Sequence, residues 1–550
     1  VSFCLLVFGI DAPEALLFLH VATFIIFLHA TPQILYGTLR YSWAWKHVGI
    51  IDYIQRHGTV NPEISYLGAY HNWPGFFALN ALITEIAGGG SALSYAGWAP
   101  AFFNLIDLGA LVFIYKTFTR DRRLIWLSVW FFFLSNWVGQ DYFSPQAMVS
   151  FMYLVILAIC LRWFRSSGVP MRPTLRLPRS LDRLVEIVYR VIGRATPAEG
   201  IAAAPDRPGL RVGLMIIVIM LLIVVASSHQ LTPLMTISAL AALVLSGLCA
   251  ARGLPVLMTV LTATWIMYMA VAFLNGNLRW VITSIGLLTS NFSANLINLA
   301  QASPGQVLVA WMDRGLSAMV WVMAILGCMR RIRNGYWDLP AVLLAFSPFP
   351  MIAANSYGGE IVFRVYFFGL PFAVFLAAAL VYPDPKVGLR LRTAMGAIAL
   401  SALLLVGLLF AYYGKERQYY FTPEEVAAAE YFQQVAPPGA MLMDASWNWP
   451  LHYKNYEFYD YFSLVTMSKN ERLELLRDPV GVIRGLMEER PNTYLVFTRS
   501  QKAYIDMTGV MPAGSLDAIE RALMASDQFG LAFANRHAKI FVLARNGIGN

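Results

Sequence analysis

The sequence predicts an α-helical polytopic membrane protein with about eleven transmembrane helices, followed by a small C-terminal α/β domain outside the cytoplasmic membrane. Hydrophobic residues make up 58% of the 550 residues and charged residues only 13%, about half the charged fraction of a typical soluble domain. Apolar runs of about twenty residues, the length that crosses the hydrocarbon core, recur through most of the chain. The composition then changes sharply after Tyr413.

The apolar runs divide the first part of the chain into candidate spans. We expect spans over 14–36, 98–116, 124–138, 142–164, 212–228, 231–250, 255–274, 307–329, 339–354, 361–381 and 393–413. The apolar run 2–10 at the start of the sequence is either a truncated earlier helix or an alternative start.

Basic residues predict which loops lie in the cytoplasm. They gather in the turn 116–123, the arginine-rich loop 165–211, Arg252, the run 330–333 and the segment 386–392. Each falls where the alternation of spans requires a cytoplasmic loop, as the positive-inside rule describes. The N-terminus is therefore expected inside and the C-terminal domain outside. These loops account for the net charge of +9, so nucleic acid is not an expected partner. An amphipathic stretch at 181–192 is expected to lie on anionic lipid.

Residues 37–97 are predicted to form one long external loop whose helices lie on the membrane. The apolar segment 73–87 has only about fifteen residues, which is short for a span. Counting it as a crossing would place every later basic loop on the wrong side. Earlier in the loop, Trp43, His47, Ile50, Ile51 and Ile54 recur at helical spacing.

Residues 414–550 are predicted to form the α/β domain, and residues 1–413 the membrane domain. Thr422 and Pro423 have the pattern of a helix cap and a first helical position. β-like runs at 440–443, 493–497 and 538–543 alternate with helical runs at 425–435 and 516–525. The four cysteines all lie outside this domain, so no disulfide framework is expected in it.

Few ionisable residues lie beside the apolar helices on the expected outer side, where a charge that faces a cavity indicates function. They are Asp52 in the first external loop, Asp141 in a turn between spans, His229 in another turn, and Glu360 with Arg364 at the start of a later span.

Each of these residues also has a purely structural interpretation. Asp52 with Arg56, and Glu360 with Arg364, stand at the i,i+4 spacing of surface ion pairs. Asp141 can cap the helix that follows it, and a histidine in a turn can simply hydrogen-bond that turn.

The order of these features resembles the GT-C superfamily of membrane glycosyltransferases, which use lipid-phosphate-linked sugars. The matching features are the early acid Asp52, the aromatic–proline segment 70–77 (YHNWPGFF), the second acid Asp141, and the later element of Arg364, Tyr366 and Pro371. The segments HNWPGFFALNAL and GQDYFSPQA most resemble the sequences of uncharacterised actinobacterial-type members of this superfamily. The resemblance covers about 14–413. Two departures are the lack of a second acid next to Asp141, which the oligosaccharyltransferase branch has, and a single proline in the aromatic segment.

The resemblance implies an inverting glycosyltransferase that moves a sugar from a polyprenyl-phosphate donor to a cell-envelope glycan, lipid or protein on the outer face of the membrane. Asp52 would be the general base, and Asp141 would position the acceptor. A divalent cation such as Mg²⁺ or Mn²⁺, if one binds, would be held by these two carboxylates. The donor phosphate and the substrates would be contacted by Arg364, His229, His71, Tyr142, Gln146 and Glu360.

Two other classes stay open: a lipid or sugar transporter or flippase, and a non-catalytic partner subunit of the same fold. Transporters often show internal repeats and broken helices at mid-membrane, whereas here the acids lie in loops and no repeat is evident. A partner subunit could dispense with Asp52 or Asp141, and both are present. A protease is poorly supported, because neither HExxH nor GxSxG occurs.

The C-terminal domain contains an aromatic-rich stretch with two interpretations. Its members are Trp447, Trp449, Tyr453, Tyr456, Tyr459 and Tyr461. They could stack on the rings of a growing glycan, or they could seal the domain onto the membrane interface. The second interpretation is favoured.

Overall fold

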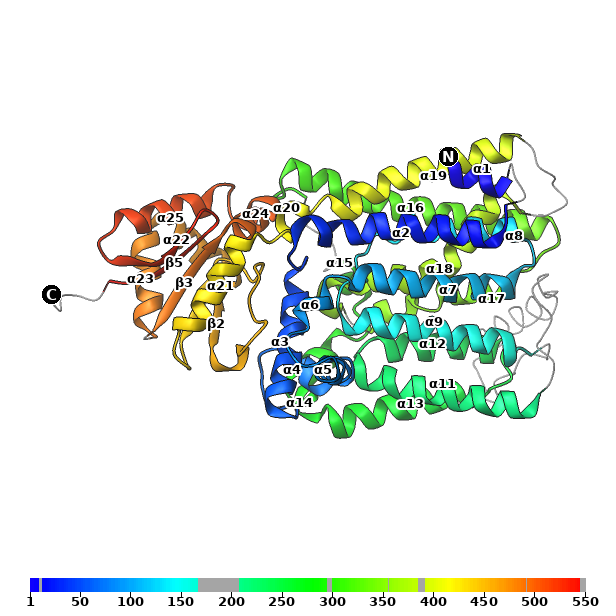
Figure 1. The fold of residues 1–550 in the computed structure, drawn as a ribbon, viewed down its shortest axis with the longest axis horizontal. Helices are drawn as coiled ribbons and strands as arrows, with labels where there is room; N and C mark the ends of the chain where they lie inside the picture. The colour runs from blue at the N-terminus through cyan, green and yellow to red at the C-terminus, as the bar shows by residue number, and fades with distance from the viewer. Residues whose placement is uncertain are drawn as a thin grey trace.

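The computed structural model shows a bundle of helices with an α/β domain at one end (Figure 1). The structure describes residues 1–8, 12–166, 207–293, 299–354, 356–383, 391–490 and 492–544. The expected amphipathic stretch 181–192, and most of the basic segments 165–211 and 386–392, lie outside the described residues.

Seven helices of the described chain are long and apolar enough to cross a membrane. They are α2 (Glu14–Tyr36), α7 (Ala99–Phe118), α9 (Pro145–Trp163), α11 (Pro208–Ser228), α16 (Pro304–Arg333), α18 (Ile361–Val381) and α19 (Leu391–Tyr413). An eighth candidate is broken: α13 (Leu254–Thr264) and the π-helical turn η1 (Trp265–Met269) meet α14 (Val271–Ser284) at a bend of 91°. The chain is thus a polytopic membrane protein with seven or eight candidate spans.

The structure corrects the expected list of about eleven full-length spans. The expected spans 124–138, 231–250 and 339–354 contain α8 (Arg122–Phe133), α12 (Thr232–Leu245) and α17 (Leu339–Phe346), which have 12, 14 and 8 residues. At about 1.5 Å per residue, none of these helices alone crosses about 30 Å of hydrocarbon. The expected span 255–274 corresponds to the broken candidate, whose helices meet at a bend near Ala270.

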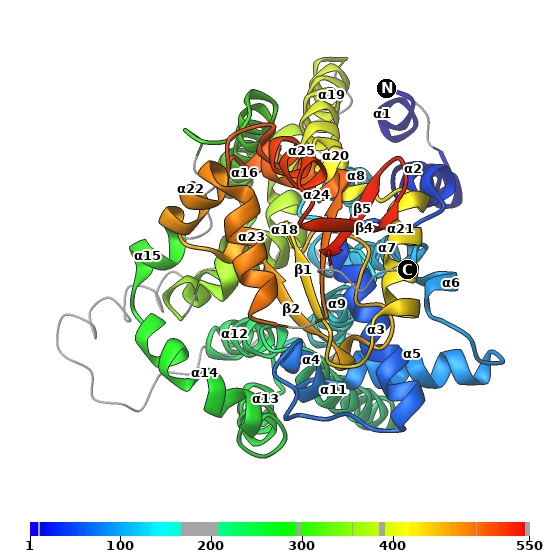
Figure 2. The same ribbon diagram turned by 90° about the vertical axis from the view of Figure 1, so that its left-hand side faces the viewer.

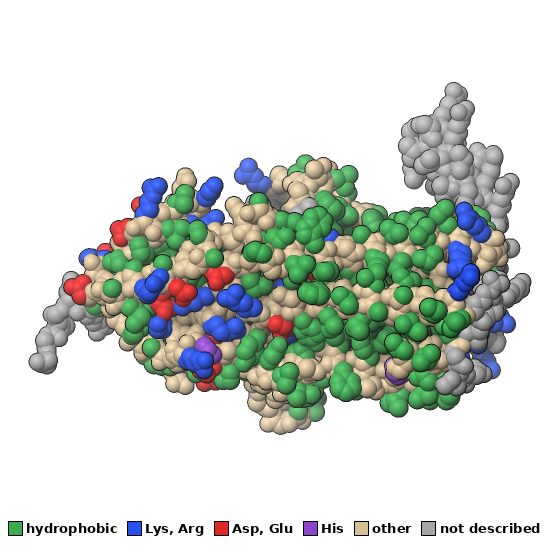
Figure 3. Space-filling view, turned by 90° about the horizontal axis from the view of Figure 1, so that it is seen from above, with side chains coloured by type: hydrophobic (Ala, Val, Ile, Leu, Met, Phe, Trp, Pro, Cys, Tyr) green, Lys and Arg blue, Asp and Glu red, His purple; other side chains and the backbone are tan. Residues whose placement is uncertain are grey.

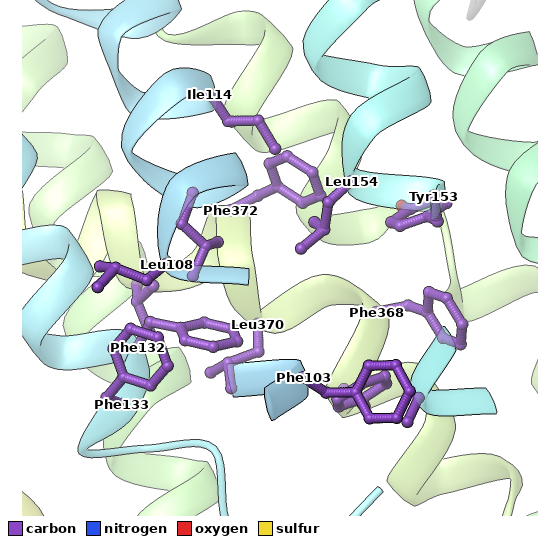
Figure 4. Close-up of a cluster of buried hydrophobic side chains, with 14 of the residues drawn as sticks. Phe103, Leu108, Ile114, Phe132, Phe133, Tyr153, Leu154, Phe368, Leu370 and Phe372 are labelled. Atoms are coloured by element: carbon purple, nitrogen blue, oxygen red, sulfur yellow. The ribbon is translucent and has the colours of Figure 1, made fainter. Parts of the chain in front are cut away.

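Helix α18 forms the centre of the bundle. Nearly all of its side chains are buried, and its Phe368 and Phe372 lie among aromatic and aliphatic side chains of α7, α8 and α9 (Figure 4). Helix α16 approaches α18 so closely that a Cβ on Gly327 would stand 1.8 Å from the carbonyl oxygen of Leu376. Small residues at such crossings let membrane helices pack backbone to backbone.

Four helices of the expected external loop lie at the end of the bundle that carries the α/β domain. They are α3 (Ser42–His57), α4 (Gly68–Asn72), α5 (Gly75–Ile86) and α6 (Leu93–Ala96). Helices α3 and α5 run across the direction of the spans, and α5 is seen end-on in Figure 1.

Hydrophobic side chains cover the middle of the bundle, and lysines and arginines gather at its far end (Figure 3). Arg331, expected as a basic anchor, is instead buried and donates to Asp338 and to the carbonyl of Pro383.

The chain after α19 continues through α20 (Glu416–Tyr419) into a five-stranded mixed sheet of order β2-β1-β3-β5-β4. Its strands are β1 (Met441–Asp444), β2 (Asp460–Ser463), β3 (Thr493–Thr498), β4 (Phe529–Ala534) and β5 (Ala538–Leu543). Helix α21 (Pro423–Val435) covers one face, and Thr422 and Glu425 form its capping box. Four helices complete the domain: α22 (Lys469–Arg477), α23 (Pro479–Glu488), α24 (Arg499–Thr508) and α25 (Ser515–Ala525).

Alternate residues of the strands enter two separate cores. Met443, Leu495 and Phe541 pack with α23 and α25, whereas Leu442, Val496 and Ile540 pack with α21. Because neighbouring residues of a strand point to opposite faces, the sheet is covered on both sides, as Figure 2 shows.

The α/β domain is seated on α3 through residues 452–457. The backbone N–H of Asn455 donates to the Asp52 carboxylate at 3.3 Å. The guanidinium of Arg56 lies 2.7 Å from Glu457. Gly49 faces the loop so closely that an added Cβ would stand 1.8 Å from the carbonyl oxygen of His452.

We expect Gly49→Ala to separate the α/β domain from α3. The carbonyl of His452 is backbone and must shift as a unit, at a cost of ~1–3 kcal/mol for an overpacked contact. Alanine's better helix propensity, worth about 1 kcal/mol, favours α3 and offsets only part of this cost. Limited proteolysis of the 452–457 loop in nanodiscs measures the effect. Gly213→Ala, in α11 with open space at its Cβ, is the control, and equal protection in both variants would contradict the prediction.

Candidate functional site

Arg364, in the first turn of α18, is a buried cation with unused hydrogen-bonding capacity. Its side chain is 7% exposed, and its Nη2 donates to the carboxylate of Glu360. Its Nε and Nη1 have no hydrogen-bond partner among the described residues. Buried donors without partners are costly and uncommon. The guanidinium therefore offers two N–H-bearing atoms to an anionic ligand.

His229 presents a hydrogen-bond donor next to this arginine. Its Nδ1 accepts from the backbone N–H groups of Leu231 and Thr232, at 3.3 and 3.2 Å. The ring proton must then be on Nε2, which lies 3.4 Å from the hydroxyl of Tyr357. Burial, and next the charge of Arg364, lower the pKa of His229 to about 3, so the ring is neutral. The expected bond to its own turn is present, and it directs Nε2–H toward the hydroxyl of Tyr357.

His47, in α3, presents the opposite tautomer. Its Nδ1 lies 2.7 Å from the carbonyl oxygen of Phe143 and must carry the proton that this bond requires. Its Nε2 is then a lone-pair acceptor, and it has no partner among the described residues although the residue is only 1% exposed. The ring stacks on Tyr142 at 5.6 Å with an interplanar angle of 8°. Burial lowers the pKa of His47 to about 4. The sequence marked this residue only as part of a helix face.

Two tyrosines connect these residues into one cluster. The ring of Tyr70 lies 4.9 Å from that of His47. Burial raises the pKa of Tyr70, which also feels the charges of Glu360 and Arg364. The pKa of Tyr142 is raised for the same first reason and feels the same two charges. We call this group the Arg364 cluster; its members are His47, Tyr70, Tyr142, His229, Tyr357, Glu360 and Arg364. The structure thus brings together four of the expected substrate-binding residues.

Gln146 comes four residues after Tyr142 in the sequence, in the first turn of α9. It is 2% exposed, and neither its amide nitrogen nor its amide oxygen has a hydrogen-bond partner among the described residues. The hydroxyl of Ser228, beside His229 in the chain, is unpaired in the same sense. Both are neutral groups that suit a hydroxylated ligand.

Asp141 lies in a separate buried network made by three helices. Its carboxylate is 2.9 Å from Nδ1 of His29 in α2 and accepts from Asn104 of α7 at 2.7 Å and from Tyr412 of α19 at 3.2 Å. Burial raises its pKa, but the pairing with His29 and the bond from Asn104 outweigh this and leave the pKa lowered. Asp141 does not cap α9, because the side chain of Ser144 does so.

Asp52 lies at the contact between α3 and the α/β domain. Its carboxylate accepts from Arg56 at 2.8 Å and from the backbone of Asn455. Among the described residues it shares no hydrogen-bonding or ion-pairing partner with Asp141. The same residues contain no group of three or more His, Cys, Asp or Glu arranged to hold a metal ion.

His71 also lies at the contact between the helix bundle and the α/β domain. Its Nδ1 accepts from the backbone N–H of Asn61 at 3.2 Å, so its Nε2–H donates to the hydroxyl of Tyr456. On the same contact, the hydroxyl of Tyr66 lies 2.8 Å from Nε2 of His452. Burial lowers the pKa of His71 to about 4 and that of His452 well below its usual value.

Acidification is therefore expected to loosen the α/β domain. The pKa of His71 is about 4 when the domain is docked and 6.5, its usual value, when the domain is released. Between these two pH values only the released state binds the proton. Docking is therefore favoured at higher pH and weakens as the pH falls from 6.5 to about 4. Burial raises the pKa of Asp444 to about 6, which acts in the opposite sense. Hydrogen exchange of residues 452–457 at pH 7 and pH 4.5 measures the balance. His71→Gln, which does not titrate, is expected to flatten the response, and an unchanged response would contradict the prediction.

A cleft of about 260 Å³ opens between the bundle and the α/β domain. Tyr142 and Glu360 of the Arg364 cluster form part of its wall, together with Trp43 and Trp137. The α/β domain contributes Trp447, Asn448 and Tyr504. We call it the interdomain cleft. It gives a ligand from solution a path to the cluster.

Comparisons with known proteins give structural likeness but no sequence match. No family model matches the sequence, and no curated protein matches it. Among solved structures, the chain is similar to the oligosaccharyltransferase of Archaeoglobus fulgidus, crystallised with a tethered acceptor peptide that contains the NVT sequon. The TM-score is 0.44 and the sequence identity 13%, over 96% of this chain and 74% of the other.

Proposed function

We propose that the protein is a GT-C-type glycosyltransferase that moves a sugar from a polyprenyl-phosphate donor to an acceptor bound in the interdomain cleft. The observation that carries this proposal is the buried guanidinium of Arg364, whose Nε and Nη1 are unpaired among the described residues. Arginine is the side chain best suited to phosphate. Arg364 lies at the end of a candidate span, the level at which a lipid phosphate would be found.

The neighbours of Arg364 suit a sugar attached to that phosphate. His47 offers an unpaired acceptor and His229 a donor that it shares with the hydroxyl of Tyr357, and both rings are neutral. Tyr142 adds an aromatic face at the cleft wall. Sugars present hydroxyl groups that both donate and accept, on a ring with apolar C–H faces. A site for a free anion alone would not need this mixture.

The proposed reaction is a single displacement at the anomeric carbon. The acceptor hydroxyl oxygen bonds to that carbon while the bond from the carbon to the phosphate oxygen breaks. Polyprenyl phosphate leaves with the bonding electrons, and Arg364 offsets its charge. Among the described residues that line the cleft, Glu360 is the one carboxylate, and its side chain is 47% exposed. We assign it the proton of the acceptor hydroxyl. A displacement of this kind inverts the anomeric configuration.

The two other carboxylates take different parts in this proposal. Asp52 holds the α/β domain on α3, since it accepts hydrogen bonds from Arg56 and from the backbone of Asn455. Asp141 is a positioning residue, because Tyr412 joins it to the wall of the cleft.

Asp52→Asn is therefore expected to keep most of the transfer activity, within about threefold, because ion pairs at partly exposed sites are worth about 0–1 kcal/mol. A base would lose ~10²–10⁴-fold. The measurement is kcat/KM for sugar transfer by protein reconstituted in lipid. A loss of that size, with the 452–457 loop still protected from protease, would return the base role to Asp52.

Radiolabelled polyprenyl-phosphate sugars test the function itself. The reconstituted protein receives each donor together with extracted cell-envelope glycans and lipids. Label that leaves the lipid and appears covalently on an acceptor supports the proposal. Label that crosses the liposome bilayer while still on its lipid would identify a flippase instead.

A further inference from the structure

We infer that the acceptor is a neutral carbohydrate and that Trp447 of the α/β domain is the platform on which it binds. This inference rests on the proposed function and names the substrate of the second half of the same site. The aromatic-rich stretch of the α/β domain was expected either to stack on sugar rings or to seal the domain onto the membrane interface.

Several members of that stretch contact other parts of the protein. Trp449 is fully buried and donates to Asp444 within the domain. Tyr456 bonds His71, and the ring of Tyr461 stacks on Tyr66 at 4.4 Å. The contacts of Tyr456 and Tyr461 join the two parts of the molecule, whereas that of Trp449 lies within the α/β domain.

Trp447 is the exception. It is 37% exposed and forms part of the wall of the interdomain cleft. The ring of Tyr504 lies 6.0 Å from it at a tilt of 58° and supports it from its own domain. A partly exposed indole beside a second aromatic ring is a platform for the C–H face of a sugar ring.

Three side-chain amides, Gln140, Gln418 and Asn448, line the same cleft as Trp447. Asn448 is fixed by its donation to the carbonyl of Gln418 at 2.8 Å. The amide oxygens of Gln418 and Gln140, which both line the cleft, have no hydrogen-bond partner among the described residues. Unpaired acceptors are what the O–H groups of a sugar would satisfy.

The charges of the cleft are already compensated within the protein. Glu360 pairs with Arg364, and Lys415 lies 3.3 Å from Asp313. A ligand at the Trp447 end thus meets aromatic rings and amides, which favours a neutral glycan over a charged peptide. Trp43 and Glu360 of the bundle line the same cleft, and the glycan's hydroxyl would react at Glu360.

Binding of defined probes to the full-length protein in nanodiscs tests this inference. The probes are short neutral oligosaccharides of mannose, glucose, galactose and arabinose, with peptides and phospholipids as competing classes. We expect at least one oligosaccharide to bind, and Trp447→Ala to weaken that binding by about tenfold, the equivalent of an aromatic contact worth ~1.4 kcal/mol. Trp447→Phe should restore most of it. Trp98→Ala, at an exposed tryptophan away from the cleft, should have no effect.

The same experiment separates this inference from the function on which it rests. Binding that is unchanged in Trp447→Ala, or confined to peptides or phospholipids, would overturn the inference, even if transfer to such an acceptor is then observed. Oligosaccharide binding that depends on Trp447 and persists in Arg364→Ala supports it. Should no polyprenyl-phosphate donor be cleaved in that case, the glycosyltransferase proposal fails and the glycan site stands.

Discussion

Arg364→Ala is expected to lower kcat/KM for sugar transfer by ~10²–10³-fold, the loss seen when a preorganised donor to developing negative charge is removed. The guanidinium is buried beside Glu360 and keeps two nitrogens unpaired among the described residues, so it has donors to spare for a phosphate. Arg364→Lys keeps the charge but presents it as a single point, and we expect it to recover only part of the loss. Steady-state kinetics and donor binding by the reconstituted variants provide the measurement.

Two further variants make this result specific. Arg333→Ala, at an exposed arginine in the last turn of α16, should transfer at the normal rate. Glu360→Gln should lower kcat without raising the donor KM, because it removes the proton acceptor and also a competitor for Arg364. Normal transfer by folded Arg364→Ala would place the reaction elsewhere in the molecule.

The fold was predictable where local pattern decides it. The helix that ends at Val435 and its Thr422 cap were expected and are present. A capping box can be recognised in the sequence because its residues lie within four consecutive positions. The strands β2 and β4 were not expected. The first has four residues, none of them buried, and the second contains Gly530 and exposed positions. Such strands are specified by their neighbours in the sheet rather than by their own alternation.

The count of spans shows another limit of composition. Hydropathy registers how apolar a segment is, but not whether its helix continues. The segment 255–274 is apolar throughout, yet the chain turns by 91° within it. In the structure, Trp265 donates to the carbonyl of Asn72, a contact that joins residues far apart in the sequence.

The candidate site was predictable by residue type and not by partner. Arg364, Glu360, His229 and Tyr142 were expected at a substrate site, and they do lie together. Asp52 was expected there as well, but its partner Asn455 is 403 residues further along the chain. The role of His47 depends on the carbonyl of Phe143, 96 residues away. No local pattern contains such pairs.

The largest expected loss of stability follows from Asp141→Ala. The carboxylate is the common partner of His29, Asn104 and Tyr412. Its removal breaks all three contacts in a buried network, at a cost of ~3–5 kcal/mol, although His29 and Tyr412 still contact each other and Asn104 still donates to Pro100. Because its pKa is lowered on balance, the stabilisation is present above the carboxylate's unfolded pKa and is lost as the pH falls through the folded one. Thermal unfolding in nanodiscs at pH 7 measures the difference, with Asp460→Ala, at an exposed pair with Arg490, as the control.

Asp141→Asn decides between a positioning role and direct contact with substrate. The amide still accepts from Asn104 but loses the charge that pairs with His29, so we expect an intermediate stability and a transfer rate that falls in step with the folded fraction. A variant that is as stable as the parent but transfers ~10²-fold more slowly, the scale of a lost catalytic group, would show that Asp141 acts on the substrate. In that case the network of three helices would serve to hold a catalytic carboxylate in place, rather than to join the helices that shape the cleft.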